Sequence, residues 1–200
     1  MMTITTSPNM MSGTWAHRIA ITGTPGSGKT SLSEFALANS NKGWLVTVVS
    51  DKKLAEQNGC LGKIDSSDGA HPIDIEQLAT SLSKLWAHPP TDDLLIDGHL
   101  SHLLPVDAIV IIRCNPEVLQ TRMQNREWAK SKIDENAEWE LLGAAWNDEH
   151  EWGNTPVLEL DSSQQSVHSL FSQIGVWRRD GFKPKSPEQR IDWITILHGE

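Results

Sequence analysis

Residues 23–30 read Gly23-Thr24-Pro25-Gly26-Ser27-Gly28-Lys29-Thr30, and this stretch decides the fold. It follows a short apolar run, residues 19–21, that is typical of a buried strand. Residues 31–36, which come next, carry their apolar side chains at helical spacing. A strand, a glycine-rich loop and a helix in this order are the context in which the pattern G-x-x-x-x-G-K-[ST] binds phosphate.

The residue types within this loop suit phosphate and a divalent cation. Glycines let backbone N–H groups turn toward a phosphate without a Cβ in the way, and the helix N-terminus adds partial positive charge. Lys29 can reach the β- and γ-phosphates of ATP, and the hydroxyl of Thr30 can bind Mg²⁺. The alternative is a chance match in a glycine-rich turn, but the motif is complete and both flanks fit. The expected ATP-binding residues of the loop are Gly23, Pro25, Gly26, Ser27, Gly28, Lys29, Thr30 and Ser31.

Composition excludes several classes of protein. The 200 residues fit one domain, and 17 Lys and Arg against 26 Asp and Glu give a formal charge of −9. This charge argues against a protein that coats nucleic acid electrostatically. The two cysteines, Cys60 and Cys114, lack the spacing of a zinc site or a disulfide framework, which suits a reducing cytoplasm.

No stretch predicts a membrane span or an export signal. The longest core-like apolar run, residues 108–112, is far too short to cross a bilayer. Residues 1–16 have neither a basic start nor an apolar segment, so we expect a flexible N-terminal tail and no signal peptide.

Strand and helix patterns alternate along the rest of the chain, which predicts an α/β fold. It would be a three-layer P-loop NTPase with a five-stranded parallel sheet and right-handed crossovers, like the nucleoside monophosphate kinases. Residues 17–180 would form this kinase domain, and residues 181–200 would be a C-terminal tail or docking extension. The predicted strands cover residues 18–22, 44–49, 94–97, 108–113 and 157–160; the second reads as buried on both faces. Predicted helices cover residues 28–38, 51–57 and 73–86, then one opened by residues 115–117, one around residues 133–144 and one over residues 165–177.

Polar side chains follow the third predicted strand directly. Asp97 ends that strand, where an acidic residue would help to bind Mg²⁺, often through water. Its alternative role is an ordinary Asp-Gly turn. His99 would either position a water or phosphate or be a solvated loop histidine, and His102 is expected to be a bystander without a zinc-binding partner.

Two arginines follow the fourth strand. Arg122 and Arg126 are four residues apart, so they would share one side of a helix. Phosphoryl transfer needs positive charge around the moving group, and these side chains could supply it; otherwise they form a solvated basic face. Further along, Lys132, Asn136 and Glu140 could equally be a surface stripe.

These elements together resemble one family. The P-loop, the sequence Ile96-Asp97-Gly98-His99 and the run from Arg122 to Glu140, with its Arg-x-x-x-Arg-x-aromatic and Lys-x-x-x-Asn-x-x-x-Glu spacings, are similar to the adenylate kinase isoenzyme-six family. This is a family of small, atypical adenylate kinases of archaea and eukaryotes that is linked to assembly of the small ribosomal subunit. The resemblance spans about residues 17–160.

The resemblance implies a reaction and roles for several residues. The reaction is ATP + AMP ⇌ 2 ADP with Mg²⁺, accompanied by ATPase activity. It implies an AMP-binding insert over residues 50–90 and a short lid over residues 126–136. In this reading Lys29, Asp97, His99 and Arg126 serve catalysis, His99 within an Asp-x-His element and Arg126 on the phosphates. Arg122 would lie near the adenine of ATP, and Thr30 and Asp97 would hold Mg²⁺.

One departure keeps two alternatives open. Family members usually carry an arginine in the AMP-binding insert, but this chain has no arginine between Arg18 and Arg113. Lys52 or Lys53 would have to substitute for it, without the bidentate fork of an arginine. The alternatives are a P-loop ATPase that acts as an assembly factor on a small-subunit ribosomal protein, or a kinase of a small metabolite.

Overall fold

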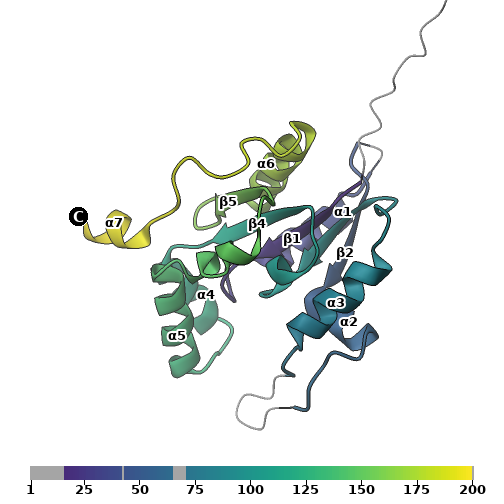
Figure 1. Cartoon of the computed structure of the whole chain (residues 1–200). Helices are drawn as coiled ribbons and strands as arrows, with labels where there is room; N and C mark the ends of the chain where they lie inside the picture. The colour runs from purple at the N-terminus through teal and green to yellow at the C-terminus, as the bar shows by residue number, and fades with distance from the viewer. Residues whose placement is uncertain (1–15, 42, 65–70, 200) are drawn as a thin grey trace, which may run out of the picture.

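The computed structural model describes residues 16–41, 43–64 and 71–199. Apart from Ala16, the predicted N-terminal tail lies outside these residues. The predicted α/β fold is confirmed: five parallel strands form one sheet in the order β2-β3-β1-β4-β5 (Figure 1). The strands are β1 (Arg18–Thr22), β2 (Val46–Ser50), β3 (Asp93–Asp97), β4 (Ala108–Arg113) and β5 (Val157–Asp161).

Helices cover both faces of the sheet and make three layers. One face packs against α1 and α6 and the other against α2 and α3, while α4 and α5 lie together beside the sheet (Figure 1). The helices are α1 (Lys29–Ala38), α2 (Asp51–Gln57), α3 (Ile75–Leu85), α4 (Pro116–Gln124), α5 (Lys130–Leu141), α6 (Val167–Arg179) and α7 (Trp193–His198), with short 3-10 turns η1 (Ser101–Leu103), η2 (Ala144–Trp146) and η3 (Glu149–Glu151). No helix among the described residues is both long and apolar enough to cross a membrane.

The central strand β1 contributes to both hydrophobic layers. Ile19 and Ile21 pack toward α1 and α6, and Ala20 packs toward the opposite layer; all three are fully buried. Parallel pairing aligns Ile21 with Asp97 of β3. The loop after β1 and the loop after β3 therefore leave the same edge of the sheet side by side, which is where ligands bind in open α/β sheets.

Strand β2 differs from its prediction. It lies at the edge of the sheet and begins at Val46, and only Val46 is buried. Val48 and Val49 pack against opposite helix layers but are only partly buried, so the prediction of a strand buried on both faces was wrong. Trp44 instead stacks on Phe171 of α6, with 4.6 Å between the ring centroids.

Helices α4 and α5 also correct two predictions. Helix α4 ends at Gln124, so Arg126 lies in the following turn and does not share a helix face with Arg122. The stripe of Lys132, Asn136 and Glu140 is not a surface feature, because Asn136 is 8% exposed and Glu140 is 1% exposed. Glu140 turns inward toward the guanidinium of Arg113, which is itself fully buried.

The C-terminal residues run back over the domain. After α6, Phe182 joins the core beneath that helix, and the backbone N–H of Val157 donates to the carbonyl of Lys185 over 2.8 Å. The chain then crosses to the side of α5, where Trp193, at the start of α7, is 4% exposed (Figure 1). Phe182, Lys185 and Trp193 thus hold this part of the C-terminal residues against the domain.

Candidate nucleotide site

The loop between β1 and α1 is shaped by its glycines. Gly23, Gly26 and Gly28 have φ values of 134°, 87° and 106°, a region that disfavours any side chain. An ideal Cβ on Gly23 would lie 2.2 Å from the carbonyl oxygen of Ile112 in β4, so the loop also needs glycine there for space. Gly28 is the N-cap of α1 and provides no side-chain cap, so the first N–H groups of the helix remain available to an anion.

Lys29 folds back over this loop. Its Nζ donates to the carbonyl oxygens of Gly23 (2.8 Å) and Thr24 (3.0 Å). Burial lowers the pKa of Lys29 from its ordinary value of 10.5 to about 8, and the charges of Asp97 and Asp51 oppose this shift. A group of phosphates would supply the negative charge that the buried ammonium lacks.

Asp97 and Thr30 face each other across the two loops. Burial raises the pKa of Asp97, and the neighbouring side chain of Thr30 opposes this shift. One hydroxyl and one carboxylate fit Mg²⁺, which keeps several waters and takes its remaining ligands from substrate phosphates. The described residues contain no cluster of three or more His, Cys, Asp or Glu that could hold a metal by themselves.

The remaining residues of the predicted loop surround this centre. Ser27 is buried, and its carbonyl accepts from the hydroxyl of Ser162 over 2.6 Å. Pro25 is partly buried in the loop, and Ser31 is exposed in the first turn of α1.

The two histidines after β3 have different surroundings. His99 is exposed, and its Nδ1 lies 3.3 Å from the carbonyl oxygen of Gly23; partial desolvation lowers its pKa. His102, which was expected to be a bystander, is 6% exposed. Its ring nitrogens share hydrogen bonds with the hydroxyl of Thr22 (2.8 Å) and the carboxylate of Asp148 (3.0 Å). Asp148 is 46 residues away, so no local pattern indicated this contact.

Arg122 and Arg126 also differ. Arg122 reaches the back of the P-loop: its Nη1 donates to the carbonyl of Ser27 (3.3 Å) and its Nη2 to the carbonyl of Ser162 (2.7 Å). Arg126 is exposed, and no side chain within the described ranges forms a hydrogen bond or ion pair with it. The structure therefore brings Lys29, Thr30, Asp97, His99 and Arg122 to one edge of the sheet and leaves Arg126 outside.

Sequence reasoning missed two carboxylates at this edge. Asp51 was expected only as the first residue of the helix over residues 51–57, yet it is 8% exposed, and its Oδ2 accepts from the backbone N–H of Leu100 over 3.2 Å. Glu140 was part of a possible surface stripe and of the family resemblance, with no role assigned to it, yet it accepts a hydrogen bond from the hydroxyl of Thr24 in the P-loop. An acidic residue after β2 was the available signal for Asp51, and the Lys-x-x-x-Asn-x-x-x-Glu spacing was the available signal for Glu140.

Comparison with known proteins agrees with this geometry. A family model described as an AAA domain matches residues 19–143. A protein of Archaeoglobus fulgidus named "Putative adenylate kinase" is 35% identical, and the match covers 90% of this chain and 93% of that protein. "Adenylate kinase isoenzyme 6 homolog FAP7" of Saccharomyces cerevisiae is 30% identical over 90% of this chain and 89% of its own length.

Solved structures agree on the fold alone. A gluconokinase of Sinorhizobium meliloti matches with a TM-score of 0.53 at 16% identity, covering 84% of this chain and 95% of that one. A shikimate kinase of Bacteroides thetaiotaomicron matches with a TM-score of 0.51 at 13% identity, covering 81% and 98%. From the P-loop site and the relatives together, the chain belongs to the adenylate kinase isoenzyme 6 family of P-loop nucleotide kinases.

Proposed function

We propose that the protein transfers the γ-phosphoryl group of ATP to AMP, giving two molecules of ADP, and that Mg²⁺ assists the transfer. The observation that carries this proposal is the meeting of Lys29, Thr30 and Asp97 at the carboxyl edge of β1 and β3. The names of the relatives, which include adenylate kinases, support the choice of AMP as acceptor.

Each residue of the site has a part in this reaction. Lys29 would neutralise the β- and γ-phosphates, and Thr30 and Asp97 would hold Mg²⁺ among waters and phosphate oxygens. When bound, the cation would offset charge on those oxygens. The attacking oxygen of AMP is already anionic, so no general base is needed. His99 would contact the phosphates from the P-loop side, and Arg122 would lie near the donor nucleotide.

Two segments would complete the site around the acceptor. Residues 50–90 would bind AMP. Among the described residues of this segment, Lys52 and Lys53 are the cations nearest to the end of β2, and both are exposed. Residues 126–136 would form a short lid that carries Arg126 to the phosphates and excludes water. The free, buried thiols of Cys60 and Cys114 support a cytoplasmic location.

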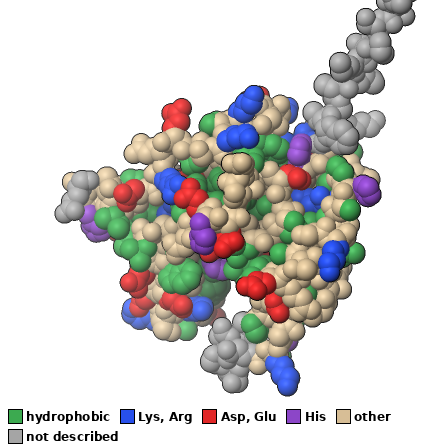
Figure 2. Space-filling view, in the orientation of Figure 1, with side chains coloured by type: hydrophobic (Ala, Val, Ile, Leu, Met, Phe, Trp, Pro, Cys, Tyr) green, Lys and Arg blue, Asp and Glu red, His purple; other side chains and the backbone are tan. Residues whose placement is uncertain are grey.

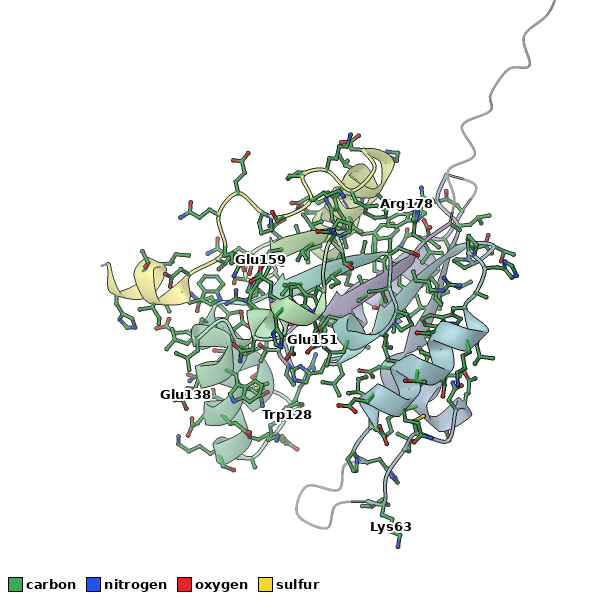
Figure 3. The ribbon with its side chains drawn as sticks, viewed as in Figure 1. Lys63, Trp128, Glu138, Glu151, Glu159 and Arg178 are labelled. Atoms are coloured by element: carbon green, nitrogen blue, oxygen red, sulfur yellow. The ribbon has the colours of Figure 1, made fainter. Side chains whose placement is uncertain are left out.

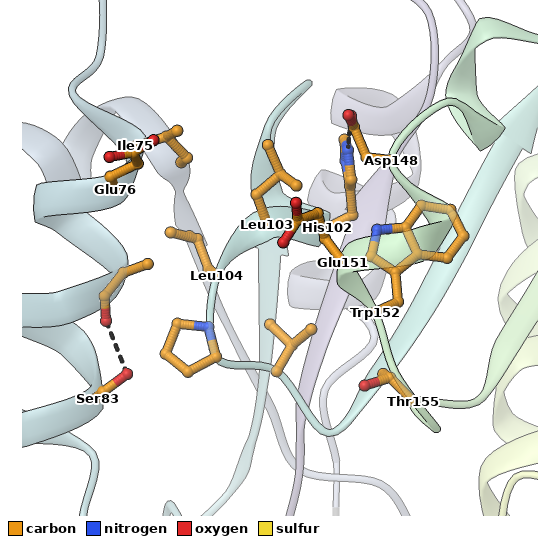
Figure 4. A pocket seen from close by; sticks show the side chains of 13 residues that line it. Ile75, Glu76, Ser83, His102, Leu103, Leu104, Asp148, Glu151, Trp152 and Thr155 are labelled. Carbon is orange, nitrogen blue, oxygen red and sulfur yellow. Dashed lines mark hydrogen bonds and ion pairs between the residues drawn. The ribbon is translucent and has the colours of Figure 1, made fainter.

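A second function is favoured by one surface feature. A groove of about 550 Å³ lies between α3, residues 102–106 and residues 148–155, and its lining includes Glu76, Asp148 and Glu151 (Figure 4). The face in Figure 2 is hollowed between the part with α4 and α5 and the part with α2 and α3, with acidic side chains beside the hollow. An acidic groove suits a basic protein, so the alternative is an ATPase that acts in assembly on a small-subunit ribosomal protein. Kinase activity on a small metabolite is the third possibility, because the fold does not determine the acceptor.

One assay separates these functions. ADP and inorganic phosphate are measured from ATP at fixed Mg²⁺, with and without AMP, and the Lys29→Ala variant is the control. Two ADP formed for each AMP consumed, with no product in the control, would establish the AMP kinase. Phosphate released without AMP would favour the ATPase, and activity restored only by another acceptor would favour the metabolite kinase.

A further inference from the structure

A buried triad of charges lies behind the P-loop. The guanidinium of Arg113 donates to Glu140 through Nε (2.7 Å) and to Glu159 through Nη1 (2.6 Å). All three side chains are at most 1% exposed. Two carboxylates against one guanidinium leave a net negative charge inside the protein, and such a charge needs additional hydrogen-bond donors.

Two tryptophans supply these donors, one to each carboxylate. The indole N–H of Trp193 donates to Oε1 of Glu140 over 2.9 Å, and that of Trp146 donates to Oε1 of Glu159 over 2.8 Å. Glu159, labelled in Figure 3, also accepts from the backbone N–H of Ile191, in the segment that leads to α7. The C-terminal extension is thus bonded to both ends of the triad.

Only one of the two carboxylates touches the P-loop. Oε2 of Glu140 accepts from the hydroxyl of Thr24, whereas Glu159 has no hydrogen bond to residues 23–30 within the described chain. The carbonyl oxygen of Thr24 in turn accepts two hydrogen bonds within the loop, from Nζ of Lys29 (3.0 Å) and from the N–H of Ser27 (3.1 Å). A displacement of Glu140 would therefore change the loop at its phosphate-binding lysine.

We propose that Trp193 is a positioning residue of the nucleotide site, which acts through Glu140 on Thr24. This inference rests on the proposed function in one respect, namely that ATP binds the P-loop. The C-terminal extension then belongs to the nucleotide site, although Trp193 lies far from the P-loop in sequence. The reason is the burial of Glu140: in a low-dielectric interior, each donor to a carboxylate constrains its orientation strongly.

The test compares two matched substitutions. Trp193→Phe and Trp146→Phe each remove one indole donor from the same triad and keep an aromatic ring. Binding of ATP with Mg²⁺ is measured by titration calorimetry, and hydrogen exchange is measured in a peptide that covers residues 23–30 without nucleotide. We expect Trp193→Phe to weaken ATP binding about threefold to tenfold, from partial loss of a charge-assisted hydrogen bond, and to speed exchange in the loop peptide. Trp146→Phe should leave both within about twofold, since its bond does not reach the P-loop.

A double-substitution cycle separates positioning from general destabilisation. In a Thr24→Val background, which lacks the hydroxyl, Trp193→Phe should weaken ATP binding no further. Equal effects of the two tryptophan substitutions, or additive effects of Thr24→Val and Trp193→Phe, would overturn the inference. Failure of the wild-type protein to bind ATP would overturn the proposed function instead, and the exchange of the loop peptide would still decide the role of Trp193.

Discussion

The carboxyl group of Asp51 occupies the space that a side chain on Gly98 would need. An ideal Cβ on Gly98 would lie 1.9 Å from Cγ of Asp51, and its three nearest atoms all belong to that carboxyl group. This contact joins the end of β2 to the loop after β3, and the charge of Asp51 favours the protonated form of Lys29. Gly98 therefore lets a buried carboxylate approach the phosphate-binding lysine.

Replacing Gly98 with alanine should displace Asp51. We expect Gly98→Ala to lower the free energy of unfolding by about 1–3 kcal/mol through overpacking, and to reduce phosphotransfer. The double variant Gly98→Ala/Asp51→Ala should recover stability, because the colliding atoms are gone, but it should not recover activity. Urea denaturation and the ADP assay test both statements; a double variant no more stable than Gly98→Ala would contradict the packing argument.

The lowered pKa of Lys29 predicts how stability depends on pH. In the folded protein Lys29 loses its proton at about pH 8, and in the unfolded chain at 10.5, so between these values the unfolded chain binds more protons. The free energy of unfolding of the wild type should therefore rise with pH relative to Lys29→Met, by about 3 kcal/mol across this window. Denaturation of both proteins at intervals of pH checks this; a constant difference would show that the lysine is not desolvated.

Alanine in place of Arg126 should reduce catalysis and leave stability unchanged, whereas alanine in place of Arg122 should reduce stability. Arg126→Ala should leave the free energy of unfolding within about 0.5 kcal/mol, because Arg126 is exposed. If the lid closes as proposed, this variant should lower kcat about a hundredfold, as for other residues that stabilise transition-state charge. Arg122→Ala should cost about 1–3 kcal/mol of stability, since the carbonyl of Ser162 loses its arginine donor and the carbonyl of Ser27 keeps only the hydroxyl of Ser162. Unchanged kcat in Arg126→Ala would exclude that arginine from the lid.

Asp97 should determine the need for Mg²⁺. We expect Asp97→Asn to raise the Mg²⁺ concentration for half-maximal activity about tenfold to a hundredfold, a range typical of groups that hold a cation through water. Because burial raises the pKa of Asp97, activity at limiting Mg²⁺ should fall as the pH drops through that raised pKa, and excess Mg²⁺ should restore it. An Mg²⁺ dependence identical to that of the wild type would remove Asp97 from the cation site.

Local sequence patterns were sufficient to predict the fully buried strands of the sheet. Strand β1 was predicted at its observed bounds, Arg18–Thr22, and so was β4 at Ala108–Arg113, because continuous apolar runs mark strands buried on both faces. The same rule failed for β2, since the position of a strand within the sheet depends on pairing with distant segments. The turn after Gln124 was missed for a similar reason, as the arginine spacing there suited a continuing helix.

The sequence by itself determined the phosphate-binding loop and its place between β1 and α1, because the glycines, Lys29 and Thr30 act within one contiguous stretch. The tertiary structure alone decided which distant carboxylates support that loop. Asp51 lies at the start of α2, directly after the edge strand β2. Glu140 lies in α5 and accepts a hydrogen bond from Trp193. Such contacts join residues far apart in the chain, and only the packing of the layers determines whether a charged side chain faces water or the P-loop.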